Sequence, residues 1–234
     1  MNIVYAMTRH VYPWILPSIT SLMEHNPKAR VFILAEDDSL PFSLPVNAEI
    51  INVTGQTYFP KSGVNYNTPF KYINLLKVRY PSLLPVNKVI HLDIDTIICD
   101  SLEGLWKTDV AGKWFASCQE YKSYYRPFGE KYYNMGVSLI NLQQMRKDKI
   151  EGLMTDYLNE VKQPWADQDA WNKYGLEQGK IVPLDIRWNE CFATGYTDNP
   201  AIVHYCGAWD WYTRKSGFRQ EYLDEYKRKL GLIR

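Results

Sequence analysis

The stretch from Val89 to Ile98 constrains the fold of this chain more than any other. It is a run of apolar, mostly β-branched residues that two carboxylates, Asp93 and Asp95, interrupt. Runs of this kind fit a strand that is covered on both faces of a sheet. Side chains two positions apart on a strand point to the same face, with Cα atoms about 7 Å apart. The run therefore predicts a buried strand of an α/β sheet that carries two aspartates on one face.

The paired aspartates indicate a cation site. Two carboxylates held side by side repel each other unless a cation or a shared proton neutralises them. The carboxyl end of a strand in an α/β sheet is also where ligands bind. A divalent metal is therefore the functional interpretation of Asp93 and Asp95. Coincidence is the alternative, because a chain of this length carries one Asp-x-Asp by chance about half of the time.

The composition narrows the classes of partner. The 234 residues are 46% hydrophobic and 23% charged, with a net charge of +1. We expect no nucleic-acid partner, because phosphate binding needs clustered Lys and Arg. Aromatic residues make up 15% of the chain, with 18 Tyr and 8 Trp. Rings with a polar edge suit surfaces that meet hydroxyl-rich, partly apolar ligands such as sugars.

The cysteines and the apolar runs bear on location. The four cysteines form no Cys-x-x-Cys pair, so no zinc or redox motif is expected; they are Cys99, Cys118, Cys191 and Cys206. No signal sequence precedes the first strand pattern, and no apolar run has the length of a membrane span. A reducing cytoplasm is the expected location.

The first half of the chain alternates strand and helix patterns. Apolar runs predict strands at residues 2–7, 31–35 and 49–53. Pro13 is expected to open one helix, and Pro69 another that leads into the run at Val89. This order predicts a parallel, doubly wound sheet. The polar stretch 54–68 contains two glycines and a proline and is expected to be a mobile loop over the cleft.

The pattern changes after Asp95. Strands at 114–117 and 137–140 follow with no long helix between them, and strands without crossovers pair antiparallel. A mixed sheet is therefore predicted beyond the central strand. The remaining expected elements are helices at 101–106, 150–161 and 166–174 and strands at 181–184 and 201–205.

One domain is expected over residues 1–217, followed by a helical tail at 218–234. Basic residues gather near the end of the tail: Lys227, Arg228, Lys229 and Arg234. A solvated helix end is the simpler interpretation of this charge, with weak contact to a membrane surface as the alternative.

Four blocks in order resemble family 8 glycosyltransferases, the retaining enzymes of GT-A fold that include glycogenin and bacterial lipopolysaccharide galactosyl- and glucosyltransferases. The blocks are Leu83–Pro85 with Lys88–Thr96, Tyr133–Val137 with Leu139–Leu142, Asp167–Asp169, and His204–Gly207. The resemblance covers nearly the whole chain. It implies a Rossmann-like, doubly wound mixed sheet in a single domain.

The resemblance assigns a metal site. It implies that Asp93, Asp95 and His204 hold a divalent cation that bridges the diphosphate of a nucleotide-sugar donor. Oxygen ligands with one imidazole suit Mn²⁺, with Mg²⁺ as the weaker candidate. Taken without the resemblance, His204 on an apolar strand reads as a core histidine.

Two further blocks are implied to touch the donor sugar. Asn134 and Gly136 would line it, although without the resemblance the glycine reads as a conformationally permissive strand entry. Asp167 and Asp169 would contact sugar hydroxyls, although this block also reads as a helix cap. The Gln168 amide would lie near the reacting carbon, so Gln168 and Asp169 are the candidate catalytic residues.

The chain departs from the family pattern after its first strand. The family usually has an acidic residue there, where uracil and ribose bind, whereas this chain has Thr8, Arg9 and His10. Ala6 and Thr8 can still present backbone groups to a base.

A second departure follows Gly207. The family commonly has Lys-Pro-Trp soon after this glycine, whereas this chain reads Asp210 and Trp211. The diphosphate thereby loses an expected cation. The candidate substitutes are Lys77, Arg214 and Lys215.

The leading hypothesis is a metal-dependent retaining transferase that moves glucose or galactose from a UDP-sugar to a hydroxyl of a glycan, lipid-linked or protein acceptor. A phosphatase of the haloacid dehalogenase type also places Asp-x-Asp after a strand, but usually after its first strand, and here three strand patterns come first. A non-catalytic sugar-binding protein that keeps the fold is the other alternative. Variable loops build acceptor sites, so the acceptor stays open.

Overall fold

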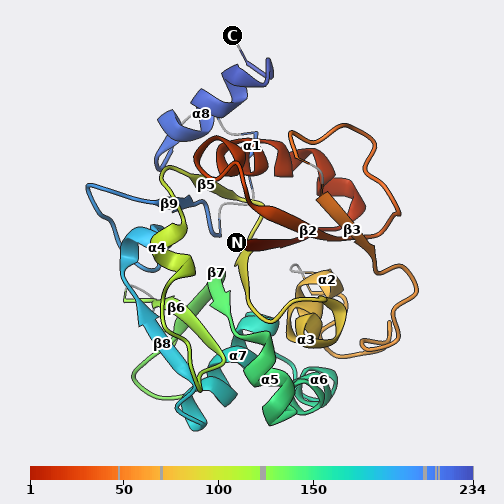
Figure 1. Ribbon diagram of the computed structural model, residues 1–234. Helices are drawn as coiled ribbons and strands as arrows, with labels where there is room; N and C mark the ends of the chain where they lie inside the picture. Colours follow the sequence, from red (N-terminus) through yellow and green to blue (C-terminus); the bar gives the residue numbers. More distant parts are fainter. Residues whose placement is uncertain are drawn as a thin grey trace.

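The computed structural model describes residues 1–46, 48–68, 71–121, 125–207, 210–213, 215 and 217–233. Within them a single domain forms around one large mixed sheet (Figure 1). The strands of this sheet lie in the spatial order β3-β2-β1-β4-β7-β6-β8. In chain order they are β1 (Asn2–Ala6), β2 (Arg30–Ala35), β3 (Ala48–Asn52), β4 (Val89–Leu92), β6 (Phe115–Gln119), β7 (Tyr133–Ile140) and β8 (Ile181–Leu184).

The pairing confirms the predicted change of topology beyond the central strand. Strands β3, β2, β1 and β4 are parallel neighbours. Strand β7 runs antiparallel to both β4 and β6, and β8 runs parallel to β6. Parallel pairing needs a crossover of a dozen or more residues, usually a helix. Between β4 and β6 the chain forms strand β5 (Thr96–Ile98), which belongs to another sheet, and the short helix α4 (Glu103–Trp106). No long helix crosses over in this described stretch, and β7 pairs antiparallel with both of its neighbours.

The side chains of the buried strands alternate between two apolar cores. Along β1, Val4 packs on the side of the lower helices in Figure 1, whereas Ile3 and Tyr5 pack on the side of α1. The α-helices besides α4 are α1 (Ile15–His25), α2 (Lys71–Leu75), α3 (Tyr80–Leu83), α5 (Leu142–Asp148), α6 (Ile150–Glu160), α7 (Asp167–Glu177) and α8 (Gln220–Lys229). The 3-10 helices are η1 (Arg9–Trp14), η2 (Leu76–Arg79) and η3 (Ile186–Trp188).

The central apolar run divides between two sheets. Its first part forms β4, and its last part forms β5 (Thr96–Ile98), which pairs antiparallel with β9 (Ile202–His204) in a separate two-stranded sheet. Thr96 lies opposite His204 in this pair. The prediction of one strand with both aspartates on one face is therefore wrong, because Asp93 and Asp95 lie in a turn at the junction of the sheets. The end of β9 comes directly beside them.

Several element boundaries differ from the predicted ones. Pro13 lies inside η1, and α1 begins two residues later. Helix α5 was not predicted, because it has only seven residues; the Asn141 side chain begins it by accepting a hydrogen bond from the Gln144 amide. Strand β7 begins at Tyr133, four residues earlier than predicted. Pro69 and Phe70, expected to open a helix, lie outside the described residues.

The polar loop 54–68 is packed against α6, whereas mobility over the cleft was expected. Phe59 and Asn65 are fully buried. The Asn65 side chain donates to the carbonyls of Leu158 and Val161 at 2.7 Å each and accepts from the Gln163 amide at 2.8 Å. A polar loop is anchored in this way because its asparagine satisfies the open carbonyls at the end of α6.

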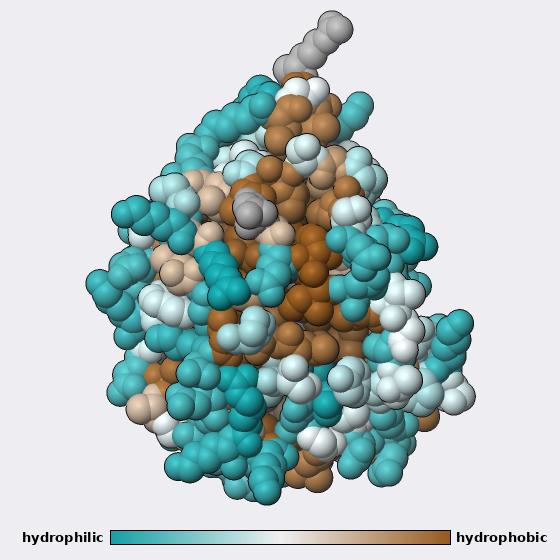
Figure 2. Space-filling view, turned by 45° about the vertical axis from the view of Figure 1, so that its right-hand side comes forward, coloured by the Kyte–Doolittle hydropathy of each residue, from teal (hydrophilic) through white to brown (hydrophobic). Residues whose placement is uncertain are grey.

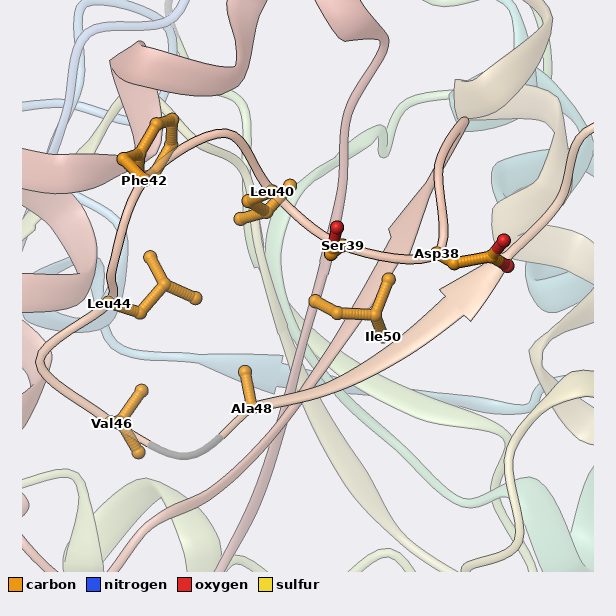
Figure 3. A pocket seen from close by; sticks show the side chains of 8 residues that line it. All are labelled: Asp38, Ser39, Leu40, Phe42, Leu44, Val46, Ala48 and Ile50. Carbon is orange, nitrogen blue, oxygen red and sulfur yellow. The ribbon is translucent and has the colours of Figure 1, made fainter.

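At the β3 edge of the sheet, apolar residues extend the core that lies on the α1 side. Figure 2 shows hydrophobic surface gathered in the middle of one face, with hydrophilic side chains around it. The loop before the edge strand β3 arches away from it, and side chains from both line an open pocket of about 230 Å³ (Figure 3). Leu40, Phe42 and Leu44 of this loop and Ile50 of β3 pack partly buried against the core that includes α1.

The C-terminal helix α8 packs on α1 at the top of Figure 1. Lys229, expected as part of a free basic end, forms ion pairs with Glu24 at 2.7 Å and Glu225 at 2.9 Å. The Tyr226 hydroxyl lies 3.5 Å from His25 Nε2. Among the described residues, no helix combines the length and apolarity needed to cross a membrane. Membrane-surface contact by the tail stays a prediction.

Candidate active site

Two segments far apart in sequence bring the predicted metal ligands together. Asp93 follows β4, and its amide donates to the Gly136 carbonyl of β7 at 2.7 Å. The Asp95 carbonyl accepts from the Tyr205 amide at 2.9 Å, which fixes the end of β9 against the aspartates. His204 Nε2 lies 3.3 Å from Asp95 Oδ1 and 3.9 Å from Asp93 Oδ2. The fold therefore assembles the three residues in one cluster.

A chain of amides fixes the proton on the His204 ring. The Gly136 amide can only donate, and it donates to Asn134 Oδ1 at 3.0 Å. Asn189 Nδ2 donates to the same oxygen at 2.9 Å, so the other end of the Asn189 amide, Oδ1, faces His204 Nδ1 at 2.8 Å. Nδ1 therefore carries a hydrogen, and the lone pair of the neutral ring is on Nε2.

The cluster fits a divalent cation. His204 Nε2 is buried and has no hydrogen-bond partner, although two carboxylates lie close to it. Burial opposes the charged form of His204, but Asp95 outweighs burial and raises the pKa of the imidazole. The same attraction would hold a metal ion in place of the proton, with oxygen and nitrogen ligands that suit Mn²⁺.

Gly136 has no side chain, and His204 and Asp93 occupy the space where one would lie. A Cβ atom at this position would lie 2.1 Å from His204 Cε1, 2.8 Å from His204 Nε2 and 2.9 Å from Asp93 Oδ2. Gly136 lies within β7 and has no positive φ angle. The interpretation as a conformationally permissive strand entry is therefore wrong, because close approach is what requires glycine here.

Lys77 is a buried cation beside Asp93 and Asp167. Its Nζ is 2.8 Å from Asp93 Oδ1 and 4.0 Å from Asp167 Oδ2. Burial opposes the charge on Lys77, but Asp167 and Asp93 outweigh it and raise the pKa of the ammonium. Burial also raises the pKa of Asp167 to about 7, against the opposing effect of Lys77. Asp167 Oδ2 is buried without a hydrogen-bond partner, so this oxygen can accept from a ligand.

His91 supports Asp93 and was not identified from the sequence. Its Nε2 lies 2.9 Å from Asp93 Oδ1, and its Nδ1 lies 3.0 Å from the Tyr80 hydroxyl. Burial, assisted by Lys77, lowers the pKa of His91 to about 4, so the ring is neutral. Its position two residues before Asp93, on the same face of the strand, is the signal that could have identified it.

Glu120 joins the two amides that the resemblance assigned to the donor sugar. Its Oε1 accepts from Asn134 Nδ2 at 2.8 Å and from Gln168 Nε2 at 3.1 Å. Gln168 Oε1 in turn accepts from the Met135 amide at 2.9 Å. Burial raises the pKa of Glu120. Sequence reasoning missed this carboxylate, whose only signal was its place three residues after the predicted strand 114–117; it directly follows the observed β6.

Asp169, the second candidate catalytic residue, is fully buried and engaged with the protein. Its Oδ1 accepts from the Tyr132 hydroxyl at 2.7 Å, and its Oδ2 accepts from the Trp165 amide at 2.9 Å. Asp169 therefore positions the start of α7. Contact between Asp169 and a substrate stays a prediction.

The predicted base-binding residues lie where β1 ends. Ala6 is its last residue, and Thr8 is buried with its hydroxyl 3.1 Å from His10 Nε2. Arg9 pairs with Asp37, which follows the neighbouring strand β2, at 2.7 Å. Acidic groups are thus present at this edge of the sheet, although they come from the end of β2.

The segment after Gly207 is only partly described. Gly207 is exposed with a φ of +72°, and a Cβ atom there would lie 3.0 Å from the Phe192 ring. Trp211 is buried and stacks on Tyr205 with ring centroids 5.7 Å apart. Lys215 is exposed, and Arg214 lies outside the described residues. Of the two candidates that the structure describes, Lys77 is the one whose ammonium pairs with Asp93.

A parallel half-sheet with carboxylates at its strand ends and a histidine from a distant strand defines a ligand site of an α/β enzyme. The sequence model described as Glycosyl transferase family 8 matches residues 2–211. The chain belongs to glycosyl transferase family 8, a family of glycosyltransferases. The haloacid dehalogenase alternative does not hold, since the aspartates follow β4 and the family match spans nearly the whole chain.

Curated relatives carry related names. A protein of Haemophilus influenzae named "Putative glycosyltransferase" is 26% identical over 81% of this chain and 63% of its own length. "General stress protein A" of Bacillus subtilis is 25% identical over 82% of this chain and 74% of its own length. "Glycosyltransferase GlyA" of Streptococcus pneumoniae is 26% identical over 82% of this chain. The chain spans 63% of the first relative and 29% of GlyA.

Solved structures share the fold. The galactosyltransferase LgtC in complex with donor and acceptor sugar analogues superposes with a TM-score of 0.76 at 23% identity, over 100% of this chain and 98% of that chain. The glycosyltransferase GlyE of Streptococcus pneumoniae superposes with a TM-score of 0.69 over 96% of this chain and 59% of that chain. The predicted GT-A fold is therefore confirmed.

Proposed function

We propose that the protein transfers a hexose, glucose or galactose, from a UDP-sugar to a hydroxyl of a glycan, lipid-linked or protein acceptor, with retention of configuration and with Mn²⁺ or Mg²⁺. One observation carries the proposal. His204 Nε2 is buried without a hydrogen-bond partner and lies within 4 Å of two carboxylates. This is a ligand set for a cation, at the strand ends where α/β enzymes bind nucleotides.

Positive charge at this place suits the departure of a diphosphate. A divalent cation held by Asp93, Asp95 and His204 would neutralise the charge that develops on the leaving group. Lys77 adds a second cation, and its ammonium is fixed by Asp93 and Asp167. Lys77 thereby supplies the charge that the family's usual Lys after Gly207 would provide, with Lys215 as the weaker candidate.

The donor sugar is proposed to lie between β7 and the start of α7. Asn134 and Gly136 would line it, and the unpartnered Asp167 Oδ2 would accept from a sugar hydroxyl. The Gln168 amide is held from both ends by Met135 and Glu120. A fixed amide dipole beside the reacting carbon can stabilise developing charge without reorganisation. Asp169 would hold this segment in place.

The uracil base and the acceptor are proposed to lie on either side of the donor sugar. Uracil would meet the backbone groups of Ala6 and Thr8 at the end of β1. The acceptor would meet exposed aromatic rings near the site, Trp165 before α7 and Phe192 beside Gly207. Sugar rings present apolar faces with hydroxyl edges, which aromatic rings with polar surroundings bind.

The test is release of UDP from UDP-glucose and UDP-galactose, with Mn²⁺ and with chelator. We expect metal-dependent release, which Asp95→Asn lowers by about a hundredfold or more because a ligand charge is lost. Asp156→Asn, which changes an exposed carboxylate on α6, is the matched control and keeps wild-type turnover. His204→Ala should weaken Mn²⁺ binding in calorimetry.

Each competing function gives a different result. A phosphatase would cleave phosphomonoesters, and a non-catalytic binding protein would be stabilised against heat by UDP and Mn²⁺ without turnover. Equal, metal-dependent turnover by Asp95→Asn and wild type would remove Asp95 from the metal site.

A further inference from the structure

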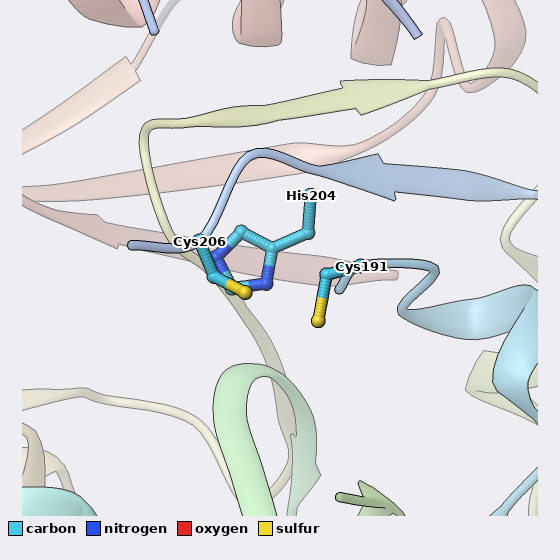
Figure 4. A group of neighbouring side chains, drawn as sticks. All are labelled: Cys191, His204 and Cys206. Atoms are coloured by element: carbon cyan, nitrogen blue, oxygen red, sulfur yellow. The ribbon is translucent and has the colours of Figure 1, made fainter. Parts of the chain in front are cut away.

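A second cluster of metal-ligating atoms lies on the other side of His204. Cys191 Sγ, Cys206 Sγ and a ring nitrogen of His204 all lie within 4.8 Å of one another. Figure 4 shows the side chains of Cys191 and Cys206 beside the His204 ring. Both cysteines are free thiols. The two cysteines are fifteen positions apart in the chain, a spacing that matches no metal-binding motif and did not predict their contact.

The fold holds the two thiols in place by different means. Cys191 is fully buried, its amide donates to the Thr194 hydroxyl at 3.1 Å, and its sulfur lies 3.4 Å from the same hydroxyl. Cys206 is half-buried and follows the end of β9, directly before the exposed Gly207. Cys191 is therefore held in place within the protein, whereas Cys206 is partly accessible to solvent.

We propose that Cys191, Cys206 and His204 Nδ1 form a binding site for a thiophilic divalent cation of the Zn²⁺ class. Two sulfurs on one tetrahedral zinc lie about 3.8 Å apart, since each Zn–S bond is about 2.3 Å. The three ligand atoms lie within 4.8 Å of one another without a metal ion, which is close to this separation. Thiolate and imidazole ligands select zinc-like ions over Mn²⁺ and Mg²⁺. Three protein ligands leave a fourth position for water.

The shared imidazole makes this ion a competitor of the ion between the aspartates. A neutral imidazole has one lone pair and one N–H. In the neutral form of the ring, Nδ1 donates to Asn189 Oδ1, 2.8 Å away, and the lone pair is on Nε2, toward Asp93 and Asp95. A cation on Nδ1 would replace the Asn189 hydrogen bond and move the proton to Nε2, 3.3 Å from Asp95 Oδ1. Nε2 could then no longer ligate a metal.

The cation site itself stands on the cluster of Cys191, Cys206 and His204, whereas the competition rests on the proposed function. Two ions that each need the lone pair of one ring weaken each other's binding by the same factor. A zinc-class ion would therefore inhibit the metal-dependent reaction without touching the substrate. Loss of Asp93 or Asp95 would remove the competition and leave the thiol site intact.

The first experiment uses Cd²⁺ as a spectroscopic substitute for Zn²⁺. Metal-free, reduced full-length protein is titrated with Cd²⁺ under anaerobic conditions, and the ultraviolet charge-transfer absorption of cadmium thiolates is recorded. We expect one ion per chain. The absorption should be roughly halved or lost in Cys206→Ser and in Cys191→Ser, and unchanged in Cys99→Ser, which alters a half-buried cysteine outside the cluster. Cys206→Ser keeps the test valid if replacement of the buried Cys191 impairs folding.

The second experiment measures competition. Mn²⁺ binding is measured as the decrease of the electron paramagnetic resonance signal of free Mn²⁺, with and without one equivalent of Zn²⁺. We expect Zn²⁺ to weaken Mn²⁺ binding by about tenfold or more in wild type and by much less in Cys206→Ser. Absence of cadmium thiolate absorption in wild type, or absorption of undiminished strength in Cys206→Ser, overturns the thiol site. Cadmium thiolate absorption in a protein that binds no Mn²⁺ keeps the thiol site and refutes the proposed metal dependence. Simultaneous, independent binding of both ions overturns the competition.

Discussion

Asp93 divides its two carboxylate oxygens between the protein and the cluster. Oδ1 lies 2.8 Å from Lys77 Nζ and 2.9 Å from His91 Nε2. Oδ2 faces His204 at 3.9 Å. Burial opposes the charge on Asp93, but Lys77 and His91 outweigh burial and lower its pKa. The carboxylate is thus held ionised and oriented by one oxygen, which leaves the other free for a cation.

The Gly136→Ala variant tests the close approach of β7 to His204. The added Cβ would lie 2.1 Å from His204 Cε1, so the ring must shift. We expect a loss of about 1–3 kcal/mol in the free energy of unfolding and a clear loss of Mn²⁺ affinity. Urea denaturation and calorimetric titration measure the two effects.

Gly152→Ala is the matched control. No atom lies within 4 Å of the Cβ that it would add to helix α6. It should stabilise the protein by about 0.5–1 kcal/mol and leave Mn²⁺ binding unchanged. Wild-type Mn²⁺ affinity in Gly136→Ala would contradict the geometry of the cluster.

Asp167 should make stability depend on pH. Its pKa is about 7 in the folded protein and about 3.9 in an unfolded chain. The folded state therefore holds more protons between these values, and the contribution of Asp167 to stability falls as pH rises from about 4 to about 7. Asp167→Asn removes this titration, so the variant should gain stability relative to wild type over the same range, by up to about 4 kcal/mol.

Thermal melts from pH 5 to pH 8 in the presence of chelator measure this difference. The exposed Asp156→Asn control should run parallel to wild type. If the melting temperatures of Asp167→Asn and wild type also run parallel, the carboxyl of Asp167 is ionised throughout the range and the inference of a raised pKa is wrong.

At the scale of the elements, the site depends on β7 and on the junction of two sheets. Strand β7 places Asn134 toward Glu120 and Asn189 and brings the Gly136 backbone to within 2.7 Å of the Asp93 amide. The small sheet of β5 and β9 brings His204 to the same place. No single element carries the whole cluster, so its geometry is a property of strand pairing.

The Asn65→Ala variant tests the anchoring of loop 54–68 on α6. The change leaves two buried carbonyls and one amide at the end of α6 without their partner. We expect a loss of about 2–3 kcal/mol in stability and faster hydrogen exchange in the loop. Asn67→Ala, which alters an exposed asparagine of the same loop, should have little effect. Equal exchange in both variants would mean that Asn65 does not hold the loop.

At the scale of the whole molecule, the C-terminal helix is tied to the site. Arg219, directly before α8, pairs with the fully buried Glu190 at 2.8 Å, and its carbonyl accepts from the Tyr205 hydroxyl. Glu190 and Tyr205 adjoin the two cysteines of the thiol cluster. The division of the chain into a domain at 1–217 and a tail at 218–234 stays a prediction, but this pair joins the two ranges.

A double-mutant cycle on Arg219 and Glu190 measures that connection. Arg219→Met leaves a buried carboxylate without its partner and should cost about 2 kcal/mol, less than for a fully buried pair because Arg219 is partly exposed. Adding Glu190→Gln should recover most of the loss. Urea denaturation provides the free energies, and strictly additive effects would show that the two side chains do not interact.

The sequence alone determined the class of fold and most of the ligand set. The period of apolar residues places the strands, and Asp93 and Asp95 come just after the apolar residues that form β4, so the sequence puts both at one strand end. The family blocks supplied His204 and Gln168. Tyr133 was recognised within a block, although its place at the start of β7 was not.

Only the tertiary structure decided which side chains meet across distant segments. Cys191 and Cys206 looked unrelated because their spacing matches no motif, yet the β9 end and the loop before it bring their sulfurs together. Glu120, His91 and Asn189 acquire their roles through partners on other elements. Local sequence encodes periodicity and turns, whereas contacts of this kind depend on strand order and register, which no local pattern contains.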